Sequence, residues 1–154
     1  MREIRIILGV IIFGFLFALA FFILTGKQWD GKSVLTLSGP NEEEIEVRVE
    51  VADTAFTRTQ GLQNRQELEE KSGMLFIVEY PQVLTFWMKN TLIPLDVLFF
   101  DEEGILIKTL SMEPCKVANC PTHSSDAAVL YALEVHAGFV NDYGVKKGWK
   151  FKMR

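Results

Sequence analysis

The sequence predicts an α+β fold that is mainly β: a small antiparallel sheet curled into a partial barrel, with one or two short helices, preceded by an N-terminal transmembrane helix. Three observations predict it. Residues 6–24 contain no polar or charged side chain, residues 45–51 alternate between apolar and charged side chains, and several short apolar segments follow between turn residues. Short strands with tight turns and few helices favour an antiparallel sheet over a helical bundle.

The N-terminal segment is long enough to be a membrane anchor. At about 1.5 Å of rise per residue, a helix over residues 6–24 crosses a hydrocarbon core about 30 Å thick. Arg2 and Arg5 precede it, and basic flanks tend to stay on the cytoplasmic side. We therefore expect a single-pass protein of the cytoplasmic membrane, with its N-terminus inside and its globular part extracytoplasmic. The small residues Ala18 and Ala20 leave a cleaved signal peptide open.

The remaining chain has room for one folded domain. We expect an anchor or uncleaved signal over residues 1–25, a linker over 26–44 and a single β-rich domain over 45–154. Gly39 and Pro40 punctuate the linker, in which Leu35 and Leu37 can add a weak strand. The net charge of −4 lacks the basic excess that nucleic acid requires, so no nucleic-acid partner is expected.

The expected elements follow from apolar periodicity and turn signals. Asp53 and Thr54 offer N-cap oxygens for a short helix that ends near Gly61. Strands are expected at residues 45–51, 74–78, 84–88, 95–100, 105–112, 129–135 and 149–153, and a helical turn at 137–143.

In the densest stretch, residues 86–96, bulky apolar side chains surround a polar cluster that consists of Lys89, Asn90, Thr91 and Asp96. Because polar groups near a core are costly unless hydrogen-bonded, this cluster must be satisfied internally or directed at a ligand. In the structural interpretation, Lys89 pairs with Asp96 or a neighbouring carboxylate, Asn90 bonds the backbone of a turn, and Trp87 is core. In the functional one, Trp87 is an apolar platform beside Lys89 and Asn90, with Arg58 arriving from the helix, which suits an anionic or sugar-like ligand.

Several motifs identify a family. They are Arg58-x-x-Gly61-Leu62, Gly73-Met74-Leu75-Phe76, Phe86-Trp87-Met88-Lys89-Asn90-Thr91, Ile93-Pro94-Leu95-Asp96 and Leu133-Glu134-Val135 before Ala137-Gly138. Together they resemble the domain of unknown function 192 family. The resemblance implies a small β-rich domain, often secreted or membrane-anchored, and no established activity, so no catalytic residue and no cofactor are carried over. Gln63 stands where members commonly have Met, which implies a more polar wall if that position lines a pocket.

Cys115 and Cys120 are the only two cysteines. An even count outside the reducing cytosol predicts a disulfide, and many members of the family look similar here. The alternative adds His123, giving Cys-x4-Cys-x2-His, three ligands that suit Cu(I) or Zn. A fourth ligand is not evident in the sequence, so we expect no metal.

The two histidines are weaker candidates. His123 precedes Ser124, Ser125 and Asp126, which supply the residue types of a hydrolytic triad, but triad members normally meet from separate elements. His136 follows a strand and is expected to be a surface or satisfied residue.

Two function classes remain from the sequence. The preferred one is a noncatalytic binding or accessory module of the cell envelope, with a small molecule, a glycan or an envelope protein as its partner. The alternative is an envelope enzyme, hydrolase-like, that uses Arg58, Lys89, Asn90 and Asp96 as polar groups.

Overall fold

The computed structural model describes residues 32–153. The elements are β1 (Ser33–Ser38), β2 (Glu44–Ala52), α2 (Ala55–Gln60), β3 (Ser72–Trp87), β4 (Leu95–Phe100), β5 (Leu106–Met112), β6 (Thr122–His136), α3 (Phe139–Asp142) and β7 (Lys150–Met153). The predicted anchor over residues 1–25 lies outside the described residues. Within the described range, no helix has the length and apolar character needed to cross a membrane.

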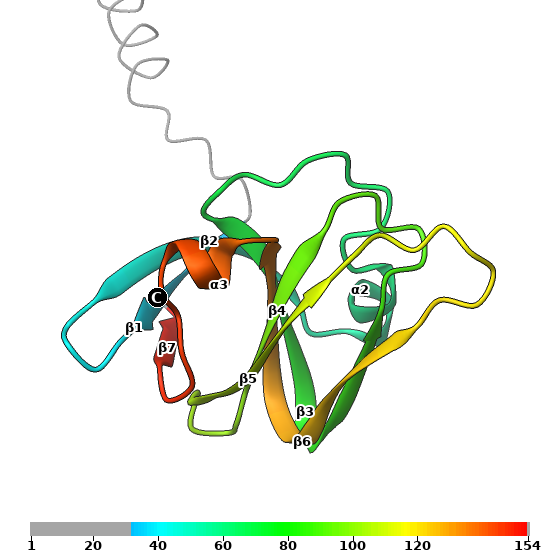
Figure 1. Ribbon diagram of the computed structural model, residues 1–154. Coiled ribbons are helices and arrows are strands. Elements are labelled where there is room, and N and C mark those ends of the chain that lie inside the picture. The colour runs from blue at the N-terminus through cyan, green and yellow to red at the C-terminus, as the bar shows by residue number, and fades with distance from the viewer. Residues whose placement is uncertain (1–31, 154) are drawn as a thin grey trace, which may run out of the picture. The chain divides into compact units, whose positions relative to one another are not determined.

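The strands form one seven-stranded sheet in the order β5-β4-β6-β3-β2-β1-β7 (Figure 1). Neighbouring strands are antiparallel except for the parallel pair β2 and β3. The sheet curls until its two edges meet at one end. There the N–H of Leu106 donates to the carbonyl of Trp149 at 2.7 Å, and the N–H of Gly148 donates to the carbonyl of Leu106 at 2.8 Å. The predicted mainly-β fold with a curled sheet and two short helices is thus confirmed.

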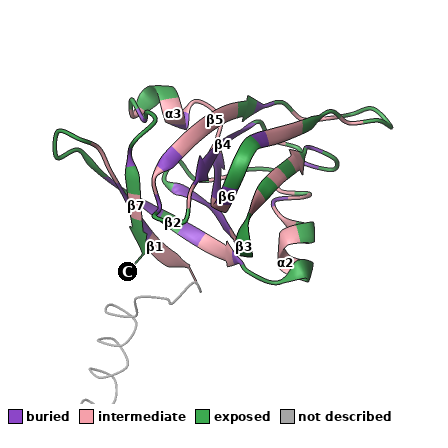
Figure 2. Ribbon diagram, turned by 90° about the horizontal axis from the view of Figure 1, so that it is seen from below, coloured by how far each residue is buried: buried purple, intermediate pink, exposed green. Residues whose placement is uncertain are grey.

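The core lies on both faces of the central strands. β4 is buried along its whole length (Figure 2). Its side chains alternate between two clusters, with Leu98 and Phe100 in the cluster enclosed by the curled sheet and Val97 and Phe99 in the cluster on the other face. Phe139 of α3 belongs to the enclosed cluster. Each fully buried side chain of this size contributes about 1.5–3 kcal/mol, so the central strands are a rigid support.

β3 corrects the prediction of two separate strands at residues 74–78 and 84–88, because these are the two halves of one strand. Ile77 pairs with Tyr131 and Gln82 with Val129, so the residues between Ile77 and Gln82 bulge out of the ladder. Pro81 lies in this bulge, where its missing N–H costs no ladder hydrogen bond. The turn-like sequence around Pro81 explains why a strand was predicted to end there.

β6 is also longer than the predicted strand over residues 129–135, since it begins at Thr122. His123 to Asp126 are therefore part of a strand and not of a loop. A second register shift lies here, and buried Ser125 fills it: its Oγ accepts from the N–H of Leu84 at 3.0 Å and donates to the carbonyl of Ala127 at 2.7 Å.

The linker predicted over residues 26–44 extends too far toward the C-terminus. Ser33–Ser38 form β1, which lies between β2 and β7, and Leu35 and Leu37 are fully buried. The weak apolar signal of these two residues marked a true strand of the sheet.

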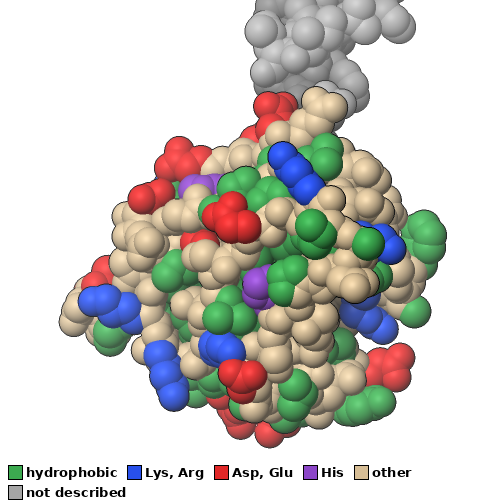
Figure 3. All heavy atoms as spheres, turned by 45° about the vertical axis from the view of Figure 1, so that its right-hand side comes forward, with side chains coloured by type: hydrophobic (Ala, Val, Ile, Leu, Met, Phe, Trp, Pro, Cys, Tyr) green, Lys and Arg blue, Asp and Glu red, His purple; other side chains and the backbone are tan. Residues whose placement is uncertain are grey.

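The surface carries both signs of charge. On the face shown in Figure 3, Lys and Arg side chains alternate with Asp and Glu side chains, and hydrophobic side chains lie between them. This face has no continuous region of one sign.

Candidate functional site

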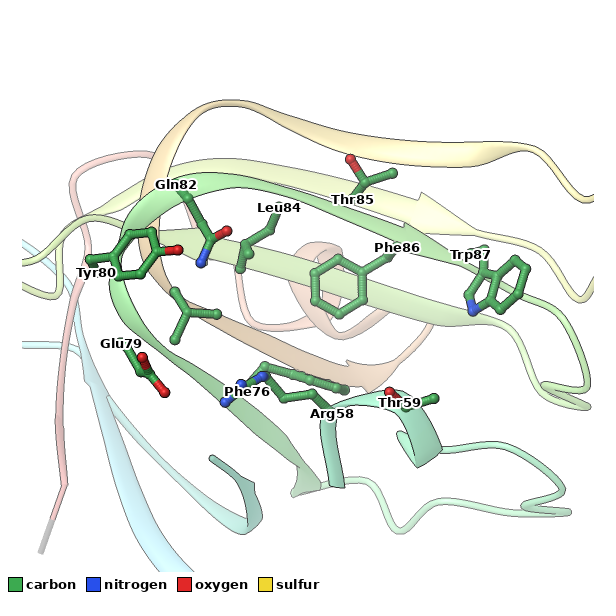
Figure 4. A pocket seen from close by; sticks show the side chains of 11 residues that line it. Arg58, Thr59, Phe76, Glu79, Tyr80, Gln82, Leu84, Thr85, Phe86 and Trp87 are labelled. Atoms are coloured by element: carbon green, nitrogen blue, oxygen red, sulfur yellow. The ribbon is translucent and has the colours of Figure 1, made fainter. Parts of the chain in front are cut away.

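The bend of β3 creates a pocket with a volume of about 540 Å³. The two halves of the strand line it from two sides, and α2 supplies a third wall (Figure 4). A capping box between Thr54 and Thr57 begins α2: each side chain accepts the backbone N–H of the other, both at 3.1 Å. The helix is therefore fixed where it meets the pocket.

Aromatic and aliphatic side chains make up much of the lining. The rings of Phe76 and Phe86 meet edge to face, with centroids 5.0 Å apart, across the bend of β3. Trp87 and Tyr80 stand at the pocket with 52% and 63% of their surface exposed. The other side chains that line the pocket are Arg58, Thr59, Val78, Glu79, Gln82, Leu84 and Thr85. Because Trp87 is half exposed, the interpretation that made it a core residue is wrong.

Arg58 joins α2 to β3. Its guanidinium donates to the carbonyl of Ile77 at 2.8 Å and also to the carbonyl of Asp53. These bonds hold a positive charge at the pocket wall. The structure thus brings together Arg58 and Trp87, two of the residues proposed from the sequence.

A smaller annex of about 40 Å³ is lined partly by the same residues, among them Arg58, Phe76 and Phe86. Gln63 is part of its wall, with its Nε2 donating to the carbonyl of Thr59 at 2.8 Å. The side chain at position 63 therefore gives this wall an amide group. Glu134 of β6 completes the annex.

Glu134 is the unusual ionisable group of the site. It is 5% exposed, and within residues 32–153 its carboxyl group has no hydrogen-bond or ion-pair partner. Burial raises the pKa of this carboxyl from its ordinary value to about 8, because the charged form loses its hydration without compensation. At neutral pH the group is mostly protonated, so it can donate a hydrogen bond.

Glu134 is not among the site residues predicted from the sequence. A signal was present, since this glutamate interrupts the apolar strand segment 129–135. A charged residue inside a strand that is buried on both faces is rare and usually has a specific role. The pattern alone did not show that β6 is central.

Lys89 and Asn90 lie next to the pocket and not in it. They line a separate hollow of about 430 Å³ with Thr91, Leu92 and residues 114–118. The Nζ atom of Lys89 lies 5.4 Å from the ring centre of Trp87, a cation–π contact. The side chain of Asn90 donates to the Oε1 atom of Gln63 at 3.3 Å. Lys89 therefore contacts a pocket residue from outside, and Asn90 contacts a residue of the annex wall.

Asp96 makes its hydrogen bonds with other parts of the fold. It is 1% exposed, and it accepts from Ser111 Oγ at 2.6 Å and from the N–H groups of Gly138 and Val140 at 3.1 and 3.0 Å. Its carboxylate therefore holds the start of α3. The expected Lys89–Asp96 pair is not formed, and Asp96 lines neither the pocket nor the annex.

The Sγ atoms of Cys115 and Cys120 lie 2.09 Å apart, at disulfide distance, as predicted. The disulfide uses both sulfurs that the metal interpretation required.

The triad interpretation also fails, because Ser125 Oγ is bonded to backbone groups and Asp126 pairs with Lys108. His136 bonds the carbonyl of Ala137 through Nδ1 at 2.9 Å, and its Nε2 is buried without a described partner.

Comparisons with known proteins provide a family model and similar solved structures. The model DUF192, described as "Uncharacterized ACR", matches residues 37–153. A candidate transcription regulator from Sinorhizobium meliloti 1021 is similar with a TM-score of 0.73 and 30% identity, over 79% of this chain and 93% of that chain. A protein of unknown function from Novosphingobium aromaticivorans DSM 12444 has a TM-score of 0.71 and 28% identity, over 79% and 84%. No curated protein matches significantly.

Proposed function

Because the chain belongs to the DUF192 family, which is described as uncharacterized, we propose its function from the pocket: it is a noncatalytic module that binds glycans of the cell envelope.

The observation that carries this proposal is the combination of aromatic faces and polar groups around one open pocket. Phe86 and Trp87 present apolar surfaces, with the buried ring of Phe76 packed against Phe86, and Arg58 and Gln82 present hydrogen-bond donors. A pyranose ring has the complementary pattern, with C–H groups on its faces and hydroxyl groups around its edge. The volume of about 540 Å³ lies in the range of small-molecule sites, about 300–1,000 Å³.

The envelope location is supported by the sequence. Residues 6–24 are continuously apolar with basic residues before them, which favours an anchored, extracytoplasmic domain. The Cys115–Cys120 disulfide is compatible with an oxidising compartment. A topology reporter fused to the C-terminus tests the extracytoplasmic location. Reporter activity only in the cytosol would contradict that location.

The description of the Sinorhizobium structure as a candidate transcription regulator is not adopted for this chain. DNA binding depends on neutralising phosphates with clustered Lys and Arg. The net charge here is −4, and the face in Figure 3 mixes both signs.

The glycan proposal is tested with chitotriose, a trimer of β-1,4-linked N-acetylglucosamine, titrated by calorimetry. The full chain is held in lipid nanodiscs, because alkyl-glycoside detergents would compete for a sugar site. We expect binding that weakens at least about tenfold in Trp87→Ala, a loss of about 1.4 kcal/mol. Phe56→Ala is the matched control, since Phe56 is 74% exposed and does not line the pocket. Absence of binding by chitotriose, its deacetylated trimer and cellotriose alike would overturn the proposal.

A hydrolase acting on the same glycans is the second candidate, and Glu134 is the observation that favours it. A carboxyl group with a raised pKa can act as a general acid. Glycoside hydrolysis normally uses two carboxyl groups, and Glu79 is the other one among the described residues that line the pocket or annex. Release of disaccharide from chitotriose, lost in Glu134→Gln, would establish this candidate in place of the noncatalytic one.

A further inference from the structure

The annex contains a fixed, unpartnered carboxyl group. Glu134 lies on the central strand β6, where it pairs with Met74 of β3 on one side and Val97 of β4 on the other. Its backbone is held by both ladders, which fix the position of its Cα atom. Glu134 is 5% exposed and lines the annex.

The surroundings of Glu134 do not provide a charge partner. β3 and β4 present the apolar Met74 and Val97 beside it, and the segment after β3 presents Thr91. Of the described residues that line the annex, Arg58 is the other ionisable group, and its guanidinium is engaged with backbone carbonyls. The carboxyl group is therefore held in its neutral form by desolvation.

A neutral carboxyl group donates one O–H and also accepts through its carbonyl oxygen, whereas a guanidinium only donates, so the annex suits a ligand group that has an acceptor oxygen. Arg58 also disfavours a cation there. The annex has room for only a small group, since its volume is about 40 Å³ and a cavity needs about 10–15 Å³ to hold one water molecule. Leu62, Phe76 and Phe86 supply apolar contacts around it.

We propose that the annex receives the acetamido group of an N-acetylated sugar, whose carbonyl oxygen accepts a hydrogen bond from the Glu134 carboxyl group and whose methyl group contacts the apolar wall. This inference rests on the proposed glycan binding. It adds a specificity residue, because the pocket would hold the sugar ring and the annex would recognise the substituent.

Three trimers that differ only at C2 test it: chitotriose carries acetamido groups, its deacetylated form carries amines, and cellotriose carries hydroxyl groups. The full chain in nanodiscs is titrated with each at pH 6, where the amines are charged. We expect chitotriose to bind at least about tenfold more tightly than the other two. Equal binding of all three would overturn the inference and leave the glycan proposal standing, whereas no binding by any trimer would overturn both. Tighter binding of the amine would show that Glu134 acts as an anion, and would also overturn the inference.

Variants at Glu134 give a second, independent measurement. Glu134→Gln keeps an N–H donor without titrating, so we expect it to retain the preference for chitotriose. Wild-type affinity should fall about tenfold from pH 6 to pH 9 as the carboxyl group loses its proton, whereas the affinity of Glu134→Gln should stay constant. Glu102→Gln, in an exposed turn, should behave like wild type. A parallel pH dependence in wild type and Glu134→Gln would contradict the role of Glu134.

Discussion

Replacing Glu134 by Gln should change how the stability of the domain depends on pH. The folded-state pKa is about 8, and the ordinary value of 4.5 applies to the unfolded chain. The folded state therefore holds its proton more tightly, so the contribution of this group to stability is greatest below about pH 4.5 and is lost as the pH rises toward 8. Between pH 5 and pH 7 the loss is about 2–3 kcal/mol, from 1.36 kcal/mol per pKa unit.

The assay is urea unfolding of the full chain in detergent at pH 5 and pH 7, followed by far-UV circular dichroism. The measured quantity is the free energy of unfolding of Glu134→Gln minus that of wild type, which cancels the titration of all other groups. We expect this difference to increase in favour of the variant by about 2–3 kcal/mol from pH 5 to pH 7. Glu102→Gln, an exposed carboxyl group, is the control for the change in charge. The same pH slope in wild type and Glu134→Gln would refute the assignment of a buried, uncompensated carboxyl group.

Three further predictions concern stability, and thermal unfolding checks each of them. Asp96→Ala should cost about 3 kcal/mol, because two backbone N–H groups at the start of α3 lose their buried acceptor; an unchanged melting temperature would show that α3 does not depend on it. Cys115→Ser with Cys120→Ser should cost about 2 kcal/mol, since the disulfide closes a loop with a sequence separation of 5; thiol titration of the wild type should find no free thiol. Thr54→Ala should cost about 1 kcal/mol through the lost cap of α2, and Thr54→Ser should restore most of it.

Local periodicity predicted the elements that depend on neighbouring residues. The alternation over residues 45–51 gave β2, and the apolar segment 95–100 gave β4 with its bounds unchanged. Residue type placed the N-cap of α2 at Asp53 or Thr54, and Thr54 is the residue that caps the helix. In each case the signal lies within one element, where spacing decides which face is buried.

The remaining features depend on residues far apart in the sequence. Pro81 marks a turn in most contexts, and only the pairing of β3 with β6 shows that the strand continues through a bulge. Asp96 was selected as a member of the polar cluster, but its hydrogen-bond partners are the distant residues Ser111, Gly138 and Val140. Glu134 became a candidate only when its strand proved to be central and its side chain to line the annex. The roles of these site residues could therefore be assigned only from their tertiary contacts.

The pairing of β1 with β7 has a consequence for biosynthesis. β1 lies at the start of the described chain, and its hydrogen-bonding partner at one edge is the segment Lys150–Met153. A nascent polypeptide that has not yet reached these residues exposes an open strand edge, which other chains can join. Loss of the segment Lys150–Met153 would therefore leave this edge of β1 unpaired and open to aggregation and to quality-control proteases.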